Sequence, residues 1–133
     1  MANDRHMGLV QQGREAFNAY RENHPEEKID LSEADLRGMC LKEINFTSAN
    51  LTKTDLRQAC LVEADLTEAN LTGADLRGAK IYNTIFEGAE LGGAKLHGAR
   101  GQSSACFAGA NLMENTTLFG HLSTEDEELN IIY

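Results

Sequence analysis

The stretch Ala64-Asp65-Leu66-Thr67-Glu68-Ala69-Asn70-Leu71-Thr72-Gly73-Ala74-Asp75-Leu76 repeats one five-residue unit. Each unit has a small residue, then an acid or amide, then a large apolar residue that we call the centre. The residue two positions before a centre is mostly small, with larger exceptions at Ile29, Met39 and Ile44. Centres recur every five residues without a gap, at Leu31, Leu36, Leu41, Phe46, Leu51, Leu56, Leu61, Leu66, Leu71, Leu76, Ile81, Phe86, Leu91 and Leu96.

A period of five fits neither an α-helix, whose period is about 3.6 residues, nor a flat strand, whose period is about two. The centre and the residue two before it can share one face of a short extended segment. The other three residues of the unit can then face water and turn a corner. A short fixed period is typical of a solenoid, in which each unit buries its inner face by stacking on its neighbours.

This pattern resembles that of the pentapeptide-repeat family, and the resemblance covers about the middle half of the chain. It implies an all-β solenoid, a right-handed quadrilateral parallel β-helix with one five-residue unit on each side of a square. About four coils are expected, lying about 4.7–4.9 Å apart, which is the ordinary strand spacing. Residues twenty apart in sequence should then stack directly on one another.

The sequence divides into an N-terminal segment, 1–28, the repeat, 29–118, and a tail, 119–133. Apolar residues share one face of a single amphipathic helix expected over about 8–23, which ends before Pro25. We interpret this helix as an N-terminal α-helical cap, because an open coil end would expose unpaired backbone groups. A helix that binds a partner is the alternative. Residues 1–6 are interpreted as an addition ahead of a natural start at Met7.

The five-residue phase breaks after Ala99 and resumes at Phe107, eleven residues after Leu96 where ten are expected. One residue is therefore inserted, and we place it near 100–104 in a bulge or small loop.

Acidity is concentrated in the tail. The net charge is −9, whereas residues 29–112 hold eleven acids against eight lysines or arginines, which gives −3. The run Glu125–Glu128 adds −4 by itself. We expect no direct binding of nucleic acid, because the coil has no basic surface excess. The apolar end, Leu129–Tyr133, is interpreted as a short C-terminal closing segment for the last coil; joining a second molecule is the alternative.

The sequence contains no run of eighteen apolar residues and does not open on a basic segment followed by an apolar one. We therefore expect no membrane span and no export, and predict a cytoplasmic location.

Charged residues recur every twenty positions along one predicted side of the coil. Like charges at strand spacing repel, so each arginine is expected to lean toward an aspartate diagonal to it. Two interpretations stay open: a solvated face of ion pairs, each worth about 0–1 kcal/mol, or an interaction stripe for a partner or an anion. The stripe comprises Arg37, Arg57, Arg77 and His97 after the centres, and Asp35, Asp55 and Asp75, with Lys95, before them.

Cys40 and Cys60 are also twenty apart and should be neighbours on adjacent coils. The distance alone permits a disulfide, but side chains on in-register parallel strands point alike and a cytosolic setting disfavours one. We expect free thiols. Zinc is disfavoured because the sequence has no Cys-x-x-Cys motif. We predict no catalytic residues, no cofactor and no metal, since the histidines are scattered and no Gly-x-Ser-x-Gly occurs.

These features favour a non-enzymatic structural or protein-interaction module with a protein partner. A monomer is favoured, with a dimer through the C-terminal end as the alternative. The family resemblance implies a second possible function, because the pentapeptide-repeat family includes DNA-mimicking modulators of DNA gyrase and topoisomerase.

Overall fold

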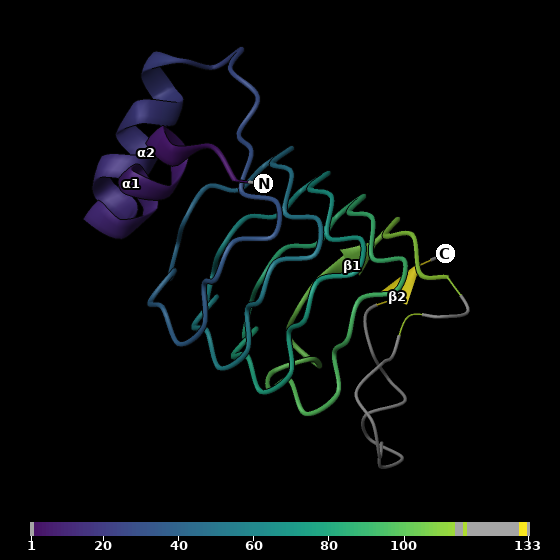
Figure 1. Ribbon diagram of the computed structural model, residues 1–133. Coiled ribbons are helices and arrows are strands. Elements are labelled where there is room, and N and C mark those ends of the chain that lie inside the picture. The colour runs from purple at the N-terminus through teal and green to yellow at the C-terminus, as the bar shows by residue number, and fades with distance from the viewer. Residues whose placement is uncertain (1, 114–115, 117–130, 133) are drawn as a thin grey trace.

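The structure, a computed structural model, describes residues 2–113, 116 and 131–132. Two helices, α1 (Asp4–Gln12) and α2 (Arg14–Asn23), precede a coil of stacked turns, as Figure 1 shows. Strands β1 (Phe107–Ala108) and β2 (Ile131–Ile132) lie at the far end of the coil. Between the helices and β1, the chain pairs through isolated parallel bridges of single residues.

In the described part of the chain, four ladders of parallel bridges run along the coil, and every member up to Lys95 directly precedes a centre. Up to Arg100, successive members are twenty residues apart, so one coil takes four five-residue units. The predicted stacking of residues twenty apart is therefore confirmed. The ladders are Asp30, Asn50, Asn70, Glu90 and Asn111; Asp35, Asp55, Asp75 and Lys95; Cys40, Cys60, Lys80 and Arg100; and Asn45, Asp65, Ile85 and Cys106.

The centres form the core. From Leu31 to Leu96 each of the predicted centres is at most 1% exposed, and each such burial contributes about 1.5–3 kcal/mol. The small residues two positions earlier are buried as well. A small side chain suits this position because the backbone of the corner leaves little room beside the centre. Where threonine takes this position, at Thr54 and Thr84, its buried hydroxyl donates a hydrogen bond to a backbone carbonyl oxygen.

The corners explain the residues that follow each centre. The N–H of Ala34 donates to the carbonyl oxygen of Leu31 (3.1 Å), which closes a turn whose third residue, Glu33, has φ of 61°. The same position has positive φ throughout the coil, and glycine occupies it repeatedly because it adopts this conformation without steric cost.

Where an aspartate or asparagine precedes a centre, it has a local structural role that the sequence analysis did not predict. In one unit, Asp65 Oδ1 accepts hydrogen bonds from the backbone N–H of Thr67 (3.0 Å) and from its hydroxyl (2.6 Å). Asn45 and Asn70 repeat this arrangement with the threonines that follow them. A side-chain oxygen that binds a backbone N–H two residues later stabilises a turn, so the recurrent Asp and Asn hold the corner.

The inserted residue appears as a change in the ladder offset. Lys80 pairs with Arg100, twenty residues on, whereas Ile85 pairs with Cys106, twenty-one residues on. The extra residue therefore lies between residues 100 and 106. Here the hydroxyl oxygen of Ser104 accepts the N–H of Asn83 (3.1 Å), a role that backbone carbonyls play at equivalent positions elsewhere in the coil.

The expected single helix over 8–23 is wrong. The chain forms two helices that break at Gly13, whose φ of 111° is open to glycine but strained for other residues. Within the stretch interpreted as an addition, the described residues 3–6 take part in the fold. Asn3 Oδ1 accepts the N–H groups of Arg5 and His6 at the start of α1. The apolar pattern continues across Gly13 and so gave no sign of the break.

Both helices lie at the N-terminal end of the coil (Figure 1), and α2 contacts the first coil directly. Phe17 is fully buried and meets Phe46 edge to face, with ring centroids 5.4 Å apart. The guanidinium of Arg21 donates from Nη1 to the carbonyl oxygen of Asn45 (2.9 Å) and from Nη2 to that of Thr47 (2.8 Å). These contacts join α2 to the backbone of the first coil.

At the other end, β2 pairs in parallel with β1, with Phe107 opposite Ile131 and Ala108 opposite Ile132. These two residues of the expected closing segment thus add to the last coil. The remainder of the tail, including the acidic run Glu125–Glu128, lies outside the described residues. Within the part that the structure describes, neither helix is long and apolar enough to span a membrane.

Candidate functional site

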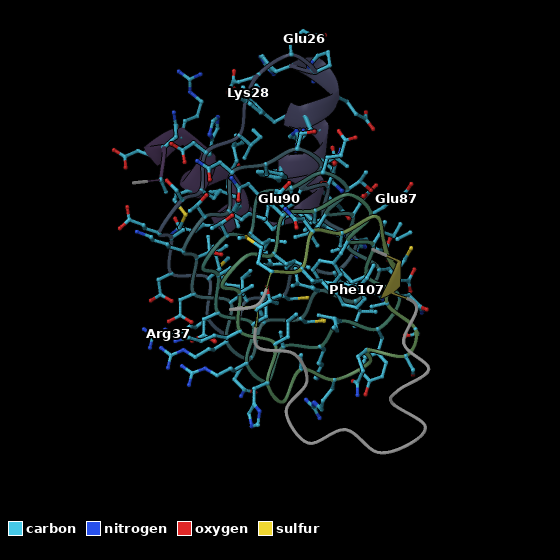
Figure 2. The ribbon with its side chains drawn as sticks, turned by 90° about the vertical axis from the view of Figure 1, so that its right-hand side faces the viewer. Glu26, Lys28, Arg37, Glu87, Glu90 and Phe107 are labelled. Atoms are coloured by element: carbon cyan, nitrogen blue, oxygen red, sulfur yellow. The ribbon has the colours of Figure 1, made fainter. Side chains whose placement is uncertain are left out.

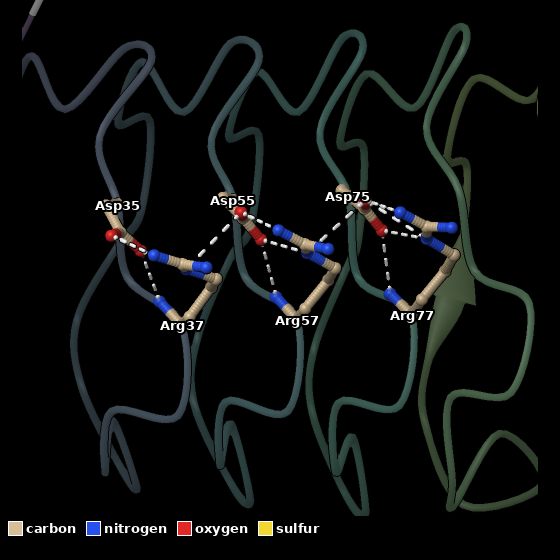
Figure 3. A network of polar contacts seen from close by, with 6 residues as sticks. All are labelled: Asp35, Arg37, Asp55, Arg57, Asp75 and Arg77. Atoms are coloured by element: carbon tan, nitrogen blue, oxygen red, sulfur yellow. Dashed lines mark hydrogen bonds and ion pairs between the residues drawn. The ribbon is translucent and has the colours of Figure 1, made fainter.

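Six of the predicted stripe residues form one continuous network on the side of the coil that carries the second ladder. We call this network the Arg–Asp column. Figure 3 shows it: the aspartates occupy one ladder, and each arginine lies two residues after its aspartate, directly after a centre. Its members are Asp35, Arg37, Asp55, Arg57, Asp75 and Arg77. In Figure 2, Arg37 points outward on a side of the coil away from Glu87.

Each arginine binds the aspartate of its own unit through two side-chain bonds. Arg37 donates from Nε to Asp35 Oδ1 and from Nη2 to Oδ2, both at 2.9 Å. The Arg57–Asp55 and Arg77–Asp75 pairs repeat this geometry, with Nη2 distances of 2.7 and 2.6 Å. Such bidentate pairing of guanidinium with carboxylate fixes the orientation of both groups. The three guanidiniums therefore stand in register.

The expectation that each arginine leans toward a diagonal aspartate is wrong for the principal contact. The diagonal contacts, from Nε of Arg37 to Asp55 and from Nε of Arg57 to Asp75, are longer, at 3.6 and 3.8 Å. The reason is the corner: each carboxylate is already held by the backbone N–H of its own arginine, as Arg37 N shows at 3.2 Å from Asp35 Oδ1. That bond places the carboxylate beside the guanidinium of the same unit.

The arginines stay partly open to solvent along the whole column. Their side chains are 56%, 40% and 46% exposed in chain order, whereas the aspartates fall from 61% through 29% to 18%. Each guanidinium uses Nε and Nη2, and Nη1 makes no hydrogen bond to a residue within the described ranges. A surface hollow of about 550 Å³ lies over the column, lined by Asp35, Arg37, Gly38, Arg57 and Gln58.

The arginines also keep the aspartates ionised. The hydrogen bonds from Arg37 lower the pKa of Asp35 from 3.8 to about 2, and those from Arg57 lower the pKa of Asp55. Burial works against ionisation of Asp75, but the hydrogen bonds from Arg77 still hold its pKa below the usual value. A carboxylate whose pKa is depressed in the folded state stabilises the fold at pH values above its unfolded pKa.

A pH titration tests this coupling. We expect carbon-detected NMR to give Asp35 a midpoint of about 2, so its contribution to stability is complete above about pH 4 and is lost as the pH falls toward 2. Arg37→Ala should raise that midpoint toward 3.8, because it removes the largest cause of the shift. The titration of Asp75, which is held by Arg77, serves as the control and should not move. A wild-type midpoint near 4 for Asp35 would contradict the geometry.

His97, which was also predicted for the stripe, does not join the network. His97 follows Arg77 by one coil and is exposed, but it makes no hydrogen bond or ion pair with any residue of the described ranges. Lys95 extends the aspartate ladder past Asp75, and its charge contributes to the lowered pKa of that aspartate. The bidentate pairing therefore ends at Arg77.

The cysteines lie on the third and fourth ladders. Cys40 and Cys60 pair directly across adjacent coils, Cys106 lies in the neighbouring ladder, and all three are free. Among the residues that the structure describes, histidines, cysteines and acids do not gather into a group of three or more able to hold a metal ion.

The ladders, the buried centres and the corner chemistry together define a β-helix built from five-residue units. A family model described as pentapeptide repeats matches eight copies over residues 29–67 and 59–98. The chain belongs to the pentapeptide-repeat family, as the sequence pattern predicted. A search among curated proteins finds no match.

Several solved structures are similar to this chain. One is the pentapeptide repeat protein Rfr23 from the cyanobacterium Cyanothece 51142, with 31% identity and a TM-score of 0.62 over 69% of this chain and 65% of that one. A pentapeptide repeat protein from the Arabidopsis thaliana thylakoid lumen matches at 31% identity and a TM-score of 0.43, over 61% of this chain and 59% of that one. A trypsin-treated variant of QnrB1, a plasmid-mediated fluoroquinolone resistance protein, matches at 21% identity and a TM-score of 0.50, over 73% and 55%. The chain thus spans less than two thirds of the length of these relatives.

Proposed function

We propose that this chain is a non-enzymatic protein-interaction module of the cytoplasm that binds a protein partner along the Arg–Asp column. The observation that carries the proposal is the set of three guanidiniums, held in register and 40–56% exposed, each with Nη1 turned to no described neighbour. A partner that presents acceptor oxygens could bind them without displacing the aspartates.

The pairing with aspartate makes the column suitable for recognition. Binding normally costs side-chain entropy, about 0.5–1.5 kcal/mol for each long side chain that becomes fixed. Here the bidentate bonds already restrict Arg37, Arg57 and Arg77 before a partner arrives. Arginine is also enriched at protein interfaces and among the residues that dominate their binding energy. The hollow between Arg37 and Arg57 adds a concave surface to the column.

The architecture forms the second part of the proposal. We infer a right-handed square coil of about four turns, with α1 and α2 acting as the cap of its first turn. The contacts of Phe17 and Arg21 with the first coil support the cap. We expect the chain to be a monomer, which sedimentation at several concentrations would test.

A double variant tests the docking role. Arg57→Ala with Arg77→Ala should leave the melting temperature nearly unchanged, because exposed ion pairs contribute only about 0–1 kcal/mol each. The same variant should lose partner proteins that the wild type retains from an extract of the source organism, quantified by mass spectrometry.

Lys42→Ala with Lys53→Ala provides the matched control, since it removes two exposed cations from other sides of the coil. The control should retain the same partners as the wild type. Equal recovery by the arginine variant and the control would refute docking on the column.

DNA-mimicking modulation of DNA gyrase is the alternative function. A DNA mimic needs negative charge along its surface to resemble the phosphate backbone, whereas the Arg–Asp column alternates charge. We therefore expect the purified chain to leave gyrase supercoiling unchanged. Inhibition of supercoiling, or protection of gyrase from a fluoroquinolone, would favour the alternative.

A further inference from the structure

We propose that Cys40 and Cys60 together form a two-coordinate site for a soft monovalent metal ion of the Cu(I) class. The proposal is independent of the Arg–Asp column, which lies on another side of the coil. It rests on how the third ladder places two thiols.

The two cysteines are in direct register. Leu41 N donates to the carbonyl oxygen of Cys60 (2.7 Å), and Cys60 N donates to that of Met39 (2.9 Å), so the coils are paired on both sides of this position. Both cysteines precede centres, a position that points away from the core, and Cys40 is exposed while Cys60 is half-buried.

The equivalent positions on the neighbouring side show how such side chains are directed. In Figure 3 the side chains of Asp35, Asp55 and Asp75 point the same way from successive coils. Two thiols that leave the backbone in parallel are separated by about the strand spacing, about 4.7–4.9 Å.

This spacing suits a bridging metal ion better than a disulfide. A disulfide needs Cβ atoms about 3.5–4.5 Å apart and sulfurs about 2.05 Å apart, so parallel side chains would have to converge. A metal–thiolate bond is about 2.3 Å long in zinc sites, so an ion midway between two sulfurs spans about 4.6 Å. A linear sulfur–metal–sulfur unit therefore fits between Cys40 and Cys60 with the coils as they are.

The ligand set selects the ion. Zinc prefers four ligands, and the described residues offer no third histidine, cysteine or acid at this place. Two thiolates alone are soft ligands of the kind that select Cu(I). Binding would release one proton from each thiol and leave a complex of charge −1. Lys80, the next member of the ladder after Cys60, supplies a cation on the adjacent coil.

The test is an anaerobic titration of the full chain with Cu(I) in competition with a chromophoric Cu(I) chelator. The wild type should withdraw one ion per chain from the chelator, and X-ray absorption should report two sulfur neighbours. Cys40→Ser and Cys60→Ser should each bind at least about tenfold more weakly, since loss of an outer-shell partner of a metal ligand already costs about 10–100-fold in affinity and each variant removes one of the two direct ligands. Cys106→Ser, which alters the cysteine of the neighbouring ladder, should bind as the wild type does.

Three results would overturn the proposal: equal Cu(I) affinity in all three serine variants, loss of binding in Cys106→Ser, or failure of the wild type to compete with the chelator. A thiol count without metal adds an independent check. Three reactive thiols are expected after exposure to air, and a count of one would show that Cys40 and Cys60 converge into a disulfide instead. Circular dichroism of each variant, expected to match the wild type, distinguishes a lost ligand from a lost fold.

Discussion

Leu66→Asp is expected to abolish cooperative folding of the whole repeat. Leu66 is fully buried, and its ladder places it between the coils that carry Phe46 and Phe86. The substitution loses about 1.5–3 kcal/mol of apolar burial and leaves an unpaired carboxylate in the core at a cost of several kcal/mol. Small domains are stable by only about 5–15 kcal/mol, so the folded state should not survive.

The measurement is thermal unfolding followed by circular dichroism. We expect no cooperative transition for Leu66→Asp at neutral pH. Lys53→Asp, which adds the same group at an exposed corner with φ of 57°, should melt close to the wild type. A wild-type melting curve for Leu66→Asp would mean that this side chain does not enter a dry interior.

Phe17→Ala should detach the helices from the first coil. Phe17 is fully buried and packs edge to face on Phe46. Truncation of a buried phenylalanine costs about 3–5 kcal/mol, which corresponds to a fall in melting temperature on the order of 10 °C for a chain of this size. The exposed end of the coil should then promote association, because its backbone groups become available to other chains.

Hydrogen exchange gives this prediction a residue-level reading. The backbone N–H of Asn45 donates to the side-chain oxygen of Asn18 (2.8 Å), so its protection depends on docked α2. Phe17→Ala should accelerate exchange at Asn45, whereas Glu22→Ala, at an exposed position of α2, should leave it unchanged. Unchanged exchange and melting in Phe17→Ala would show that the helices are not a cap.

The repeat was predictable because its period acts on every unit in the same way. Because the period is fixed, placing Leu36 or Leu56 on the surface would place every other centre on the surface too. Only one alignment of the five-residue unit therefore buries the apolar residues. The inserted residue could be placed for the same reason, since an offset in a strict period is visible without coordinates. The side of the coil on which Arg37, Arg57 and Arg77 lie followed from the same counting.

The partners of those arginines could not be predicted from the period. The five-residue period places Asp35 and Asp55 about equally near Arg37. Repulsion between stacked like charges then suggested that Arg37 pairs with the diagonal aspartate on the next coil. The decisive contact is a backbone hydrogen bond from Arg37 N to the Asp35 side chain. It holds the Asp35 carboxylate within reach of the Arg37 guanidinium, which then binds the same carboxylate. The sequence did hold a signal for this backbone bond. Aspartate or asparagine also recurs two residues before threonine, where there is no cation to pair with, so its role there must be a local one.

The sequence by itself determined the five-residue unit, the buried centres, the alignment of residues twenty apart and the position of the extra residue. These features follow from the spacing of the apolar side chains, because the hydrophobic effect buries such side chains in an interior. Only the tertiary structure decided where the helices break and which aspartate each arginine binds. Those features depend on backbone dihedrals and on distances of a few tenths of an ångström, which a pattern of residue types does not specify.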